Sequence, residues 1–224
     1  MYVDDGRTAP LQLSHSVQTL ISVAIEHQHA VVALVRDAKV LHNYAPFTLT
    51  RSAVEAAATA YWMLRPTQWK QRVRRLIIYQ RQDRYDQETV ARLIRDRLGG
   101  DLRPSLANRK RWLDELAARH HISDLPRKLE ITDVIQDVDA AIDGTRHIET
   151  YWRTASGFAH GRQWAVMDAL VHSEVIPHER DPSLAKVRLE SSLTRVLWGL
   201  ASAAEVTDGA IQLYSRACQA PGKR

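Results

Sequence analysis

An arginine, a serine and a histidine lie at helical spacing in the segment from Tyr151 to Gly161. Arg153 and His160 are seven residues apart, two helical turns, with Ser156 between them, so all three share a face. The arginine could hold a phosphate while the imidazole takes or delivers a proton, the two roles that metal-independent RNA cleavage needs. The same residues also fit a structural interpretation. In it, Ser156 and His160 bond to helix carbonyls and to each other, and Gly161 follows the helix cap.

Arg51 and Glu55 form a second charged pair, four residues apart on an expected helix. If the pair is exposed, it contributes only a few tenths of a kcal/mol. If the helix is central, the pair is buried and could meet Arg153 and His160 across the bundle. Glu55 would then fix the tautomer of the His160 ring. The sequence leaves both arrangements open.

The pattern Arg153-x6-His160 in a helical chain resembles the Arg-x4-6-His motif of HEPN-domain proteins (higher eukaryote and prokaryote nucleotide-binding). The run with Ser156 and His160-Gly161, together with the segment 50–62, also resembles a set of uncharacterised bacterial helical proteins. The HEPN resemblance implies a helical bundle that often dimerises and, in many members, metal-free endoribonuclease activity. It carries over to Arg153 and His160 only. Thr154 stands where active members commonly have Asn, Asp or His.

Other chemistries find little support in the sequence. There is no Gly-rich phosphate loop, no Gly-x-Ser-x-Gly turn and no Cys-x-x-Cys pair. Ten histidines include a single Glu-x-x-His, Glu26 to His29, without the second copy that di-iron bundles carry. We therefore predict neither a metal nor a cofactor. The one cysteine, Cys218, cannot form an internal disulfide, which is typical of a reducing compartment.

Positive charge is concentrated in the middle of the chain. Between Arg65 and Glu130, 17 Lys and Arg face 9 Asp and Glu, a net charge of +8, whereas the whole chain carries +5. Such a block permits contact with RNA or another anionic partner, with Arg72, Arg74 and Arg75 as candidate nucleic-acid contacts. It is equally typical of a solvated helix face. Tryptophans in the block, Trp69 and Trp112, could stack on bases or anchor amphipathic helices or a dimer contact.

Apolar residues recur at helical spacing along most of the chain, and glycine and proline are scarce. The helix at 46–64 has the clearest inner stripe, and Gly144 should interrupt or bend a later one. Asp181-Pro182 predicts the start of a final long helix, while 167–181 fits a helix end, a strand or a loop. The expected helices cover 11–35, 46–64, 67–98 ending at Gly99-Gly100, 104–120, about 132 to 160, and 184–217.

These elements predict an all-α fold, a bundle of five to seven mostly antiparallel helices. We expect one domain over 11–218, a tail over 1–10 and a polar tail over 219–224. No 18-residue apolar run predicts a membrane span and the first residues lack an apolar signal core, so we expect a cytoplasmic protein. Two functions follow as hypotheses. One is a HEPN-like RNA-directed protein, dimeric, in a defence or toxin system with an antitoxin or partner protein. The other is a non-catalytic interaction module in which Arg153, Ser156, His160, Arg51 and Glu55 form a buried network.

Overall fold

The chain is mostly helical, with one small antiparallel sheet. A computed structural model describes residues 1–98, 103–142, 147–181 and 184–219, and 74% of the chain is helix. In chain order the elements are α1 (Tyr2–Thr8), α2 (Leu13–Val32), a π-helix (Ala33–Asp37), α3 (Ala45–Leu64), α4 (Trp69–Leu98), α5 (Arg103–Arg119), α6 (Ile131–Ile142), α7 (His147–Ala159), α8 (Gln163–Ala169), β1 (Val171–Pro177), β2 (Ala185–Glu190) and α9 (Leu193–Cys218).

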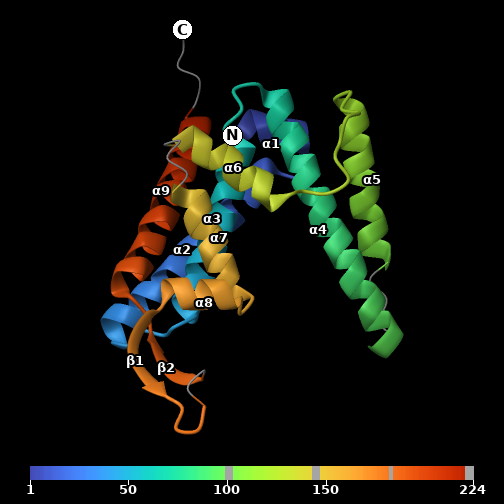
Figure 1. Cartoon of the computed structure of the whole chain (residues 1–224). Helices are drawn as coiled ribbons and strands as arrows, with labels where there is room; N and C mark the ends of the chain where they lie inside the picture. Colours follow the sequence, from blue (N-terminus) through green and yellow to red (C-terminus); the bar gives the residue numbers. More distant parts are fainter. Residues whose placement is uncertain (99–102, 143–146, 182–183, 220–224) are drawn as a thin grey trace.

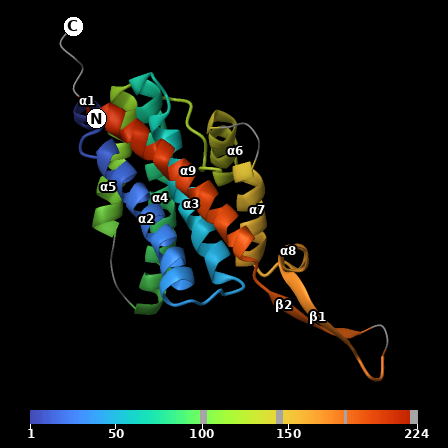
Figure 2. The same ribbon diagram turned by 90° about the vertical axis from the view of Figure 1, so that its left-hand side faces the viewer.

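Helix α3 is the centre of the main core. It packs against α2, α6, α7 and α9, and Figures 1 and 2 show it among these helices. Its buried side chains are mostly small, so its neighbours can approach closely: Ala53, Ala57 and Ala58 have no exposed surface. Pro46 lies in the first turn of α3, as its position before the apolar stripe predicts. The core therefore forms around a helix that the sequence identifies.

Helices α4 and α5 pair along their length and form an arm with its own core. Figure 1 shows the pair diverging from the bundle. Apolar side chains from both helices and the segment that follows α5 make the buried cluster of this arm: Val73, Ile77, Leu113, Leu116 and Ile122. Trp69 packs against this cluster, edge-on to His120 with 5.2 Å between ring centroids. Trp69 is therefore a packing residue.

Helix α1 connects the arm to the bundle. Asp4, only 4% exposed, accepts a hydrogen bond from Arg72 Nε of α4 at 2.7 Å. The Arg7 guanidinium lies 4.4 Å from the centre of the Trp69 ring, and the Met1 amine donates to the Ala217 carbonyl of α9. The stretch 1–10, which we expected to be a tail, thus contains a helix. It was missed because polar tertiary contacts rather than an apolar stripe stabilise it.

Strands β1 and β2 form a hairpin that projects from one end of the bundle (Figures 1 and 2). Its antiparallel register pairs Val175 with Val187, and a bulge interrupts β1 between His172 and Glu174. We expected the residues of β2 to open the last helix, which instead begins at Leu193. The cause is pairing with β1, a long-range contact that local periodicity does not report.

The number of helices differs from the expectation, while the ends of two long helices agree with it. The described residues hold nine α-helices rather than five to seven, and the helices expected at 67–98 and 104–120 are confirmed within two residues at each end. Gly99-Gly100, Gly144 and Pro182, which the sequence predicts to end, bend or start helices, and residues 220–224 of the predicted tail lie outside the described residues. Among the helices that the structure describes, none combines the length and the apolar content needed to cross a bilayer.

Candidate functional site

The end of α7 has a well-defined backbone geometry. Gly161 has φ +60°, a conformation that favours glycine, and directly follows His160 at the helix end. Its N–H donates to the Phe158 carbonyl at 3.0 Å, and the Arg162 N–H donates to the Gly157 carbonyl at 2.8 Å. This pair of bonds is a Schellman motif. Gly161 therefore follows the cap, as the structural interpretation of the sequence proposed, and His160 is the cap residue.

Arg153 lies on the outer side of α7. Its side chain is 52% exposed, and both its Nε and one terminal nitrogen donate to the same Glu149 oxygen at 2.8 Å. Glu149 is four residues earlier on the same helix and also accepts from Gln136 Nε2 at 2.8 Å. The Glu149 side chain, in contrast to that of Arg153, is only 15% exposed. An incoming anion that binds Arg153 would therefore take the place of a largely buried carboxylate.

His160 is exposed at the end of α7. Within the described ranges, no hydrogen bond or ion pair engages its ring, whereas its backbone N–H donates to the Ser156 carbonyl at 3.1 Å. Arg162, two residues later, is also exposed. The expectation that His160 bonds to Ser156 through its side chain, or receives Glu55, is therefore wrong. The ring faces solvent.

Ser156 belongs to a different set of contacts. Its hydroxyl oxygen accepts a hydrogen bond from Arg51 Nε of α3 at 2.8 Å. Arg51 also pairs with Glu55 at 2.7 Å, and the same Glu55 oxygen accepts from the Trp152 indole N–H at 2.7 Å. The Arg51 and Glu55 side chains are 22% and 24% exposed. We call these four residues, Arg51, Glu55, Trp152 and Ser156, the α3–α7 network.

The structure thus separates the five candidate residues into two groups. Arg51, Glu55 and Ser156 lie together in the α3–α7 network, while Arg153 and His160 face solvent on α7. The network lacks both residues of the Arg-x6-His pattern. Spacing along one helix could not predict this separation, because it does not determine which side of α7 contacts α3.

Trp152 was not among the candidates, although it completes the network. A signal for it existed. A tryptophan in an apolar helix must find an acceptor for its indole N–H when it is buried, and the ring is 6% exposed. Glu55 is the acceptor. A second cross-helix bond, between the hydroxyls of Thr50 and Tyr151, lies deeper in the same interface.

The three arginines proposed as nucleic-acid contacts bond within the protomer. Arg72 donates to Asp4 and to the carbonyl of Pro66 at 2.7 Å, and Arg74 donates to the Asp124 carbonyl at 2.7 Å. Arg75 donates to the Trp62 carbonyl, and its guanidinium lies 4.6 Å from the centre of the Trp62 ring. Burial lowers the pKa of Arg75, and Asp137 opposes this effect.

These bonds give the three arginines a structural role in joining α4 to its neighbours. Five of the acceptors on which they depend are four backbone carbonyls and the buried Asp4, and none of these can be identified from the sequence.

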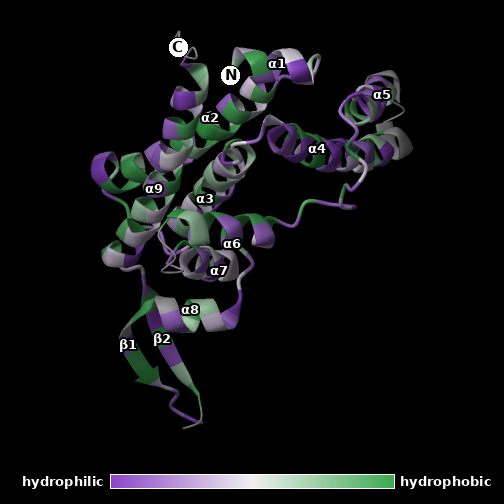
Figure 3. Ribbon diagram, turned by 90° about the horizontal axis from the view of Figure 1, so that it is seen from above, coloured by the Kyte–Doolittle hydropathy of each residue, from purple (hydrophilic) through white to green (hydrophobic). Residues whose placement is uncertain are grey.

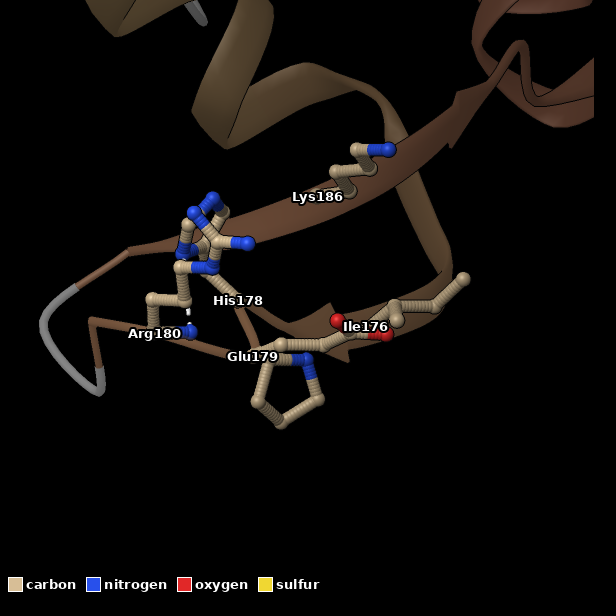
Figure 4. Close-up of a pocket in the computed structure, with 6 residues that line it drawn as sticks. Ile176, His178, Glu179, Arg180 and Lys186 are labelled. Atoms are coloured by element: carbon tan, nitrogen blue, oxygen red, sulfur yellow. Dashed lines mark hydrogen bonds between the residues drawn. The ribbon is translucent and has the colours of Figure 1, made fainter.

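Three surface cavities lie in the described part of the chain, and each is a further candidate binding site. One of about 430 Å³ lies at the hairpin tip, where His178, Arg180 and Lys186 gather with Glu179 (Figure 4). Another of about 470 Å³ lies between α1 and the end of α9, and a third of about 340 Å³ between α2 and α9. Arg153 and His160 line none of these three. Among the residues that the structure describes, no three His, Cys, Asp or Glu side chains gather to hold a metal ion.

No family model matches the sequence, and neither the curated proteins nor the solved structures include a significant match.

Proposed function

We propose that this chain is a cytoplasmic HEPN-like RNA-directed protein that uses the outer face of α7. One observation supports this most. Arg153 and His160 are exposed on a helix that Ser156 and Trp152 anchor to the centre of the bundle. A helix held in this way presents an arginine and a histidine on a rigid support, which is what positioned acid–base chemistry requires.

The roles follow from the side chains. His160 is the general base or acid that moves the proton of a ribose 2′-hydroxyl, and Arg153 binds the phosphate once Glu149 is displaced. Arg51, Glu55 and Ser156 are positioning residues, because they hold α7 and touch no substrate. The reaction is metal-independent endoribonuclease cleavage, of the kind used in defence or toxin systems, where an antitoxin or other partner protein would control it.

A non-catalytic interaction module is the second candidate. It is favoured by the completeness of the α3–α7 network, in which Arg51 and Ser156 already have partners inside the protomer, and by the pairing of Arg153 with Glu149. In that case α7 has only a structural role, and the surface of the bundle binds another protein.

The experiment is incubation of the purified protein with labelled RNA in EDTA. We expect cleavage by the wild type, loss of at least about 100-fold in rate for His160→Ala, and a comparable loss for Arg153→Ala. The matched control is His15→Ala, because His15 is also exposed on a helix but lies on α2. Absence of cleavage by the wild type, or equal activity in the His160→Ala variant, would reject the ribonuclease and leave the interaction module.

A further inference from the structure

Exposed apolar side chains are concentrated in one stretch of the described chain. Of its nineteen exposed large hydrophobic residues, ten lie between positions 164 and 198, which span α8, the hairpin and the start of α9. They are Trp164, Met167, Val171, Val175, Ile176, Leu184, Val187, Leu193, Leu197 and Trp198. Scattered single exposures are ordinary, but a concentration of this kind marks an interaction surface.

The strand register divides the hairpin into two unlike faces. Val175 lies opposite Val187 and Pro177 opposite Ala185, whereas Glu174 lies opposite Arg188 and Ile176 opposite Lys186. Directly paired residues share a face of a sheet, and neighbours along a strand alternate between faces. One face of the hairpin therefore carries Val175, Pro177, Ala185 and Val187, and we call it the apolar hairpin face. Figure 3 shows the hydrophobic residues of β1 on the projecting hairpin.

Within the described part of the chain, no layer covers the apolar hairpin face. Val175 is 58% and Val187 37% exposed, and the hairpin is attached near its base, where the Asn43 side chain donates to the Leu189 carbonyl at 3.0 Å. A two-stranded hairpin is marginally stable in water unless another layer packs against it. The hairpin is therefore expected to pack against a partner surface.

The charge of the hairpin identifies the class of partner. Residues 171–190 contain three Lys and Arg against four Asp and Glu, a net charge of −1, while the block at 65–130 carries +8. Arg188 also pairs with Glu190 at 3.1 Å. Affinity for a nucleic acid depends on an excess of cations along the contact, and the hairpin has none. An apolar face of balanced charge fits a protein partner.

The same chain carries a second group of exposed apolar side chains, next to the base of the hairpin. Trp164 and Met167 on α8 precede the hairpin directly, and Leu193, Leu197 and Trp198 on α9 follow it; we call these five the base residues. Exposed tryptophans are typical anchors of protein interfaces. We propose that the hairpin mediates dimerisation and that its apolar face packs on the base residues of a second copy of this chain. Because each copy carries both surfaces, a two-fold axis satisfies both at once.

Mass measurement on the full chain tests this proposal independently of any RNA activity. Light scattering across a concentration series should give the mass of two 25.5 kDa chains for the wild type. Val175→Glu, on the apolar hairpin face, should raise the dimer dissociation constant at least about tenfold. Ile176→Glu is the matched control, since it places the same charge one residue away on the opposite face. Circular dichroism should show both variants folded, because both positions are exposed.

Cysteine cross-linking tests whether the hairpin packs against the base residues of a second copy of the chain. In a Cys218→Ser background, Val175→Cys combined with Met167→Cys should form a disulfide-linked dimer under mild oxidation, and Ile176→Cys with Met167→Cys should not. A wild type that is monomeric at every concentration would overturn the proposal. Equal association of the Val175→Glu and Ile176→Glu variants would also overturn it. That result would show that dimerisation does not depend on the hairpin face that carries Val175.

Discussion

Arg51 links α3 to α7 through its guanidinium. It donates to Ser156 and pairs with Glu55, which in turn accepts from Trp152, so one guanidinium connects both helices. The sequence placed Arg51 and Glu55 four apart on one helix, where a buried pair could meet Arg153 and His160, but in the structure Arg51 contacts Ser156 instead. The sequence could not predict that Arg153 and His160 would lie outside, since that depends on how α7 is rotated against α3.

Removing Arg51 should destabilise the fold. Arg51→Ala leaves the half-buried Glu55 without its cation and Ser156 without its donor, so we expect a loss of about 1–3 kcal/mol in the free energy of unfolding. Arg36→Ala is the control, because Arg36 forms an exposed pair with Asp37 and its loss should change stability by less than about 0.5 kcal/mol. Urea unfolding of both variants measures the difference, and equal effects would show that the α3–α7 network contributes nothing special.

Tyr151 should make the protein sensitive to alkaline pH. Its ring is 1% exposed, and burial raises the pKa of its hydroxyl to about 12, against the hydrogen bond with Thr50, which lowers it. In the unfolded chain this hydroxyl ionises near its ordinary value of about 10, while the folded protein keeps the proton. The unfolded state is therefore favoured increasingly as the pH rises from about 10 to about 12.

The expected loss of stability over that range is on the order of 2–3 kcal/mol. Tyr151→Phe has no hydroxyl to ionise, so the difference in unfolding free energy between wild type and variant should shrink as the pH rises from 8 to 11. Chemical denaturation at several pH values measures it. A difference that stays constant with pH would mean that the hydroxyl of Tyr151 does not resist ionisation.

At the scale of elements, the helices were more predictable than the strands. The apolar stripes of α3 and α9 and the long polar helix α4 follow from three-four spacing, and the structure confirms helices there. The residues of β2, from Ala185 to Glu190, carry no turn signal that separates them from a helix start. Their strand conformation depends on β1, and helix α1 depends on Arg72 and Ala217, far away in sequence. Contacts of this kind are not encoded locally.

The crossing of α7 and α9 should tolerate no added methyl group at Gly199. A Cβ built there would overlap the ring and hydroxyl of Tyr151, which lies against the glycine and is itself buried. We expect Gly199→Ala to lower stability by about 1–3 kcal/mol, even though alanine is the better helix former. Gly6→Ala in α1 is the control, because its Cβ would meet nothing within 4 Å. It should be neutral or stabilising by up to about 1 kcal/mol. Thermal unfolding compares the two, and a stabilising Gly199→Ala would contradict the packing described.

For the whole molecule, the presence of two separate buried clusters matters most. The main core surrounds α3, and the smaller cluster lies between α4 and α5, with α1 and Arg72 connecting the two. Regions with fewer buried contacts open at lower free energy than the main core. The arm should therefore be the less stable of the two parts.

Leu113→Ala tests this separation. Leu113 is 2% exposed in the arm cluster, and its truncation should cost the arm about 2–5 kcal/mol. Hydrogen exchange followed by mass spectrometry should show faster exchange in α4 and α5 but little change in α3 and α9. Val54→Ala in α3 is the matched core variant and should increase exchange throughout the bundle. Equal loss of protection in α3 upon Leu113→Ala would show that the arm and the bundle unfold as one unit.

The position of α9 also has a consequence for synthesis on the ribosome. This helix packs against α2 and α3, and its Thr207 hydroxyl accepts a hydrogen bond from the Gln28 side chain at 2.8 Å, across a separation of 179 residues. Until α9 has left the exit tunnel, the sides of α2 and α3 that pack against it stay uncovered. The nascent chain should therefore expose an apolar surface that chaperones can bind until α9 emerges.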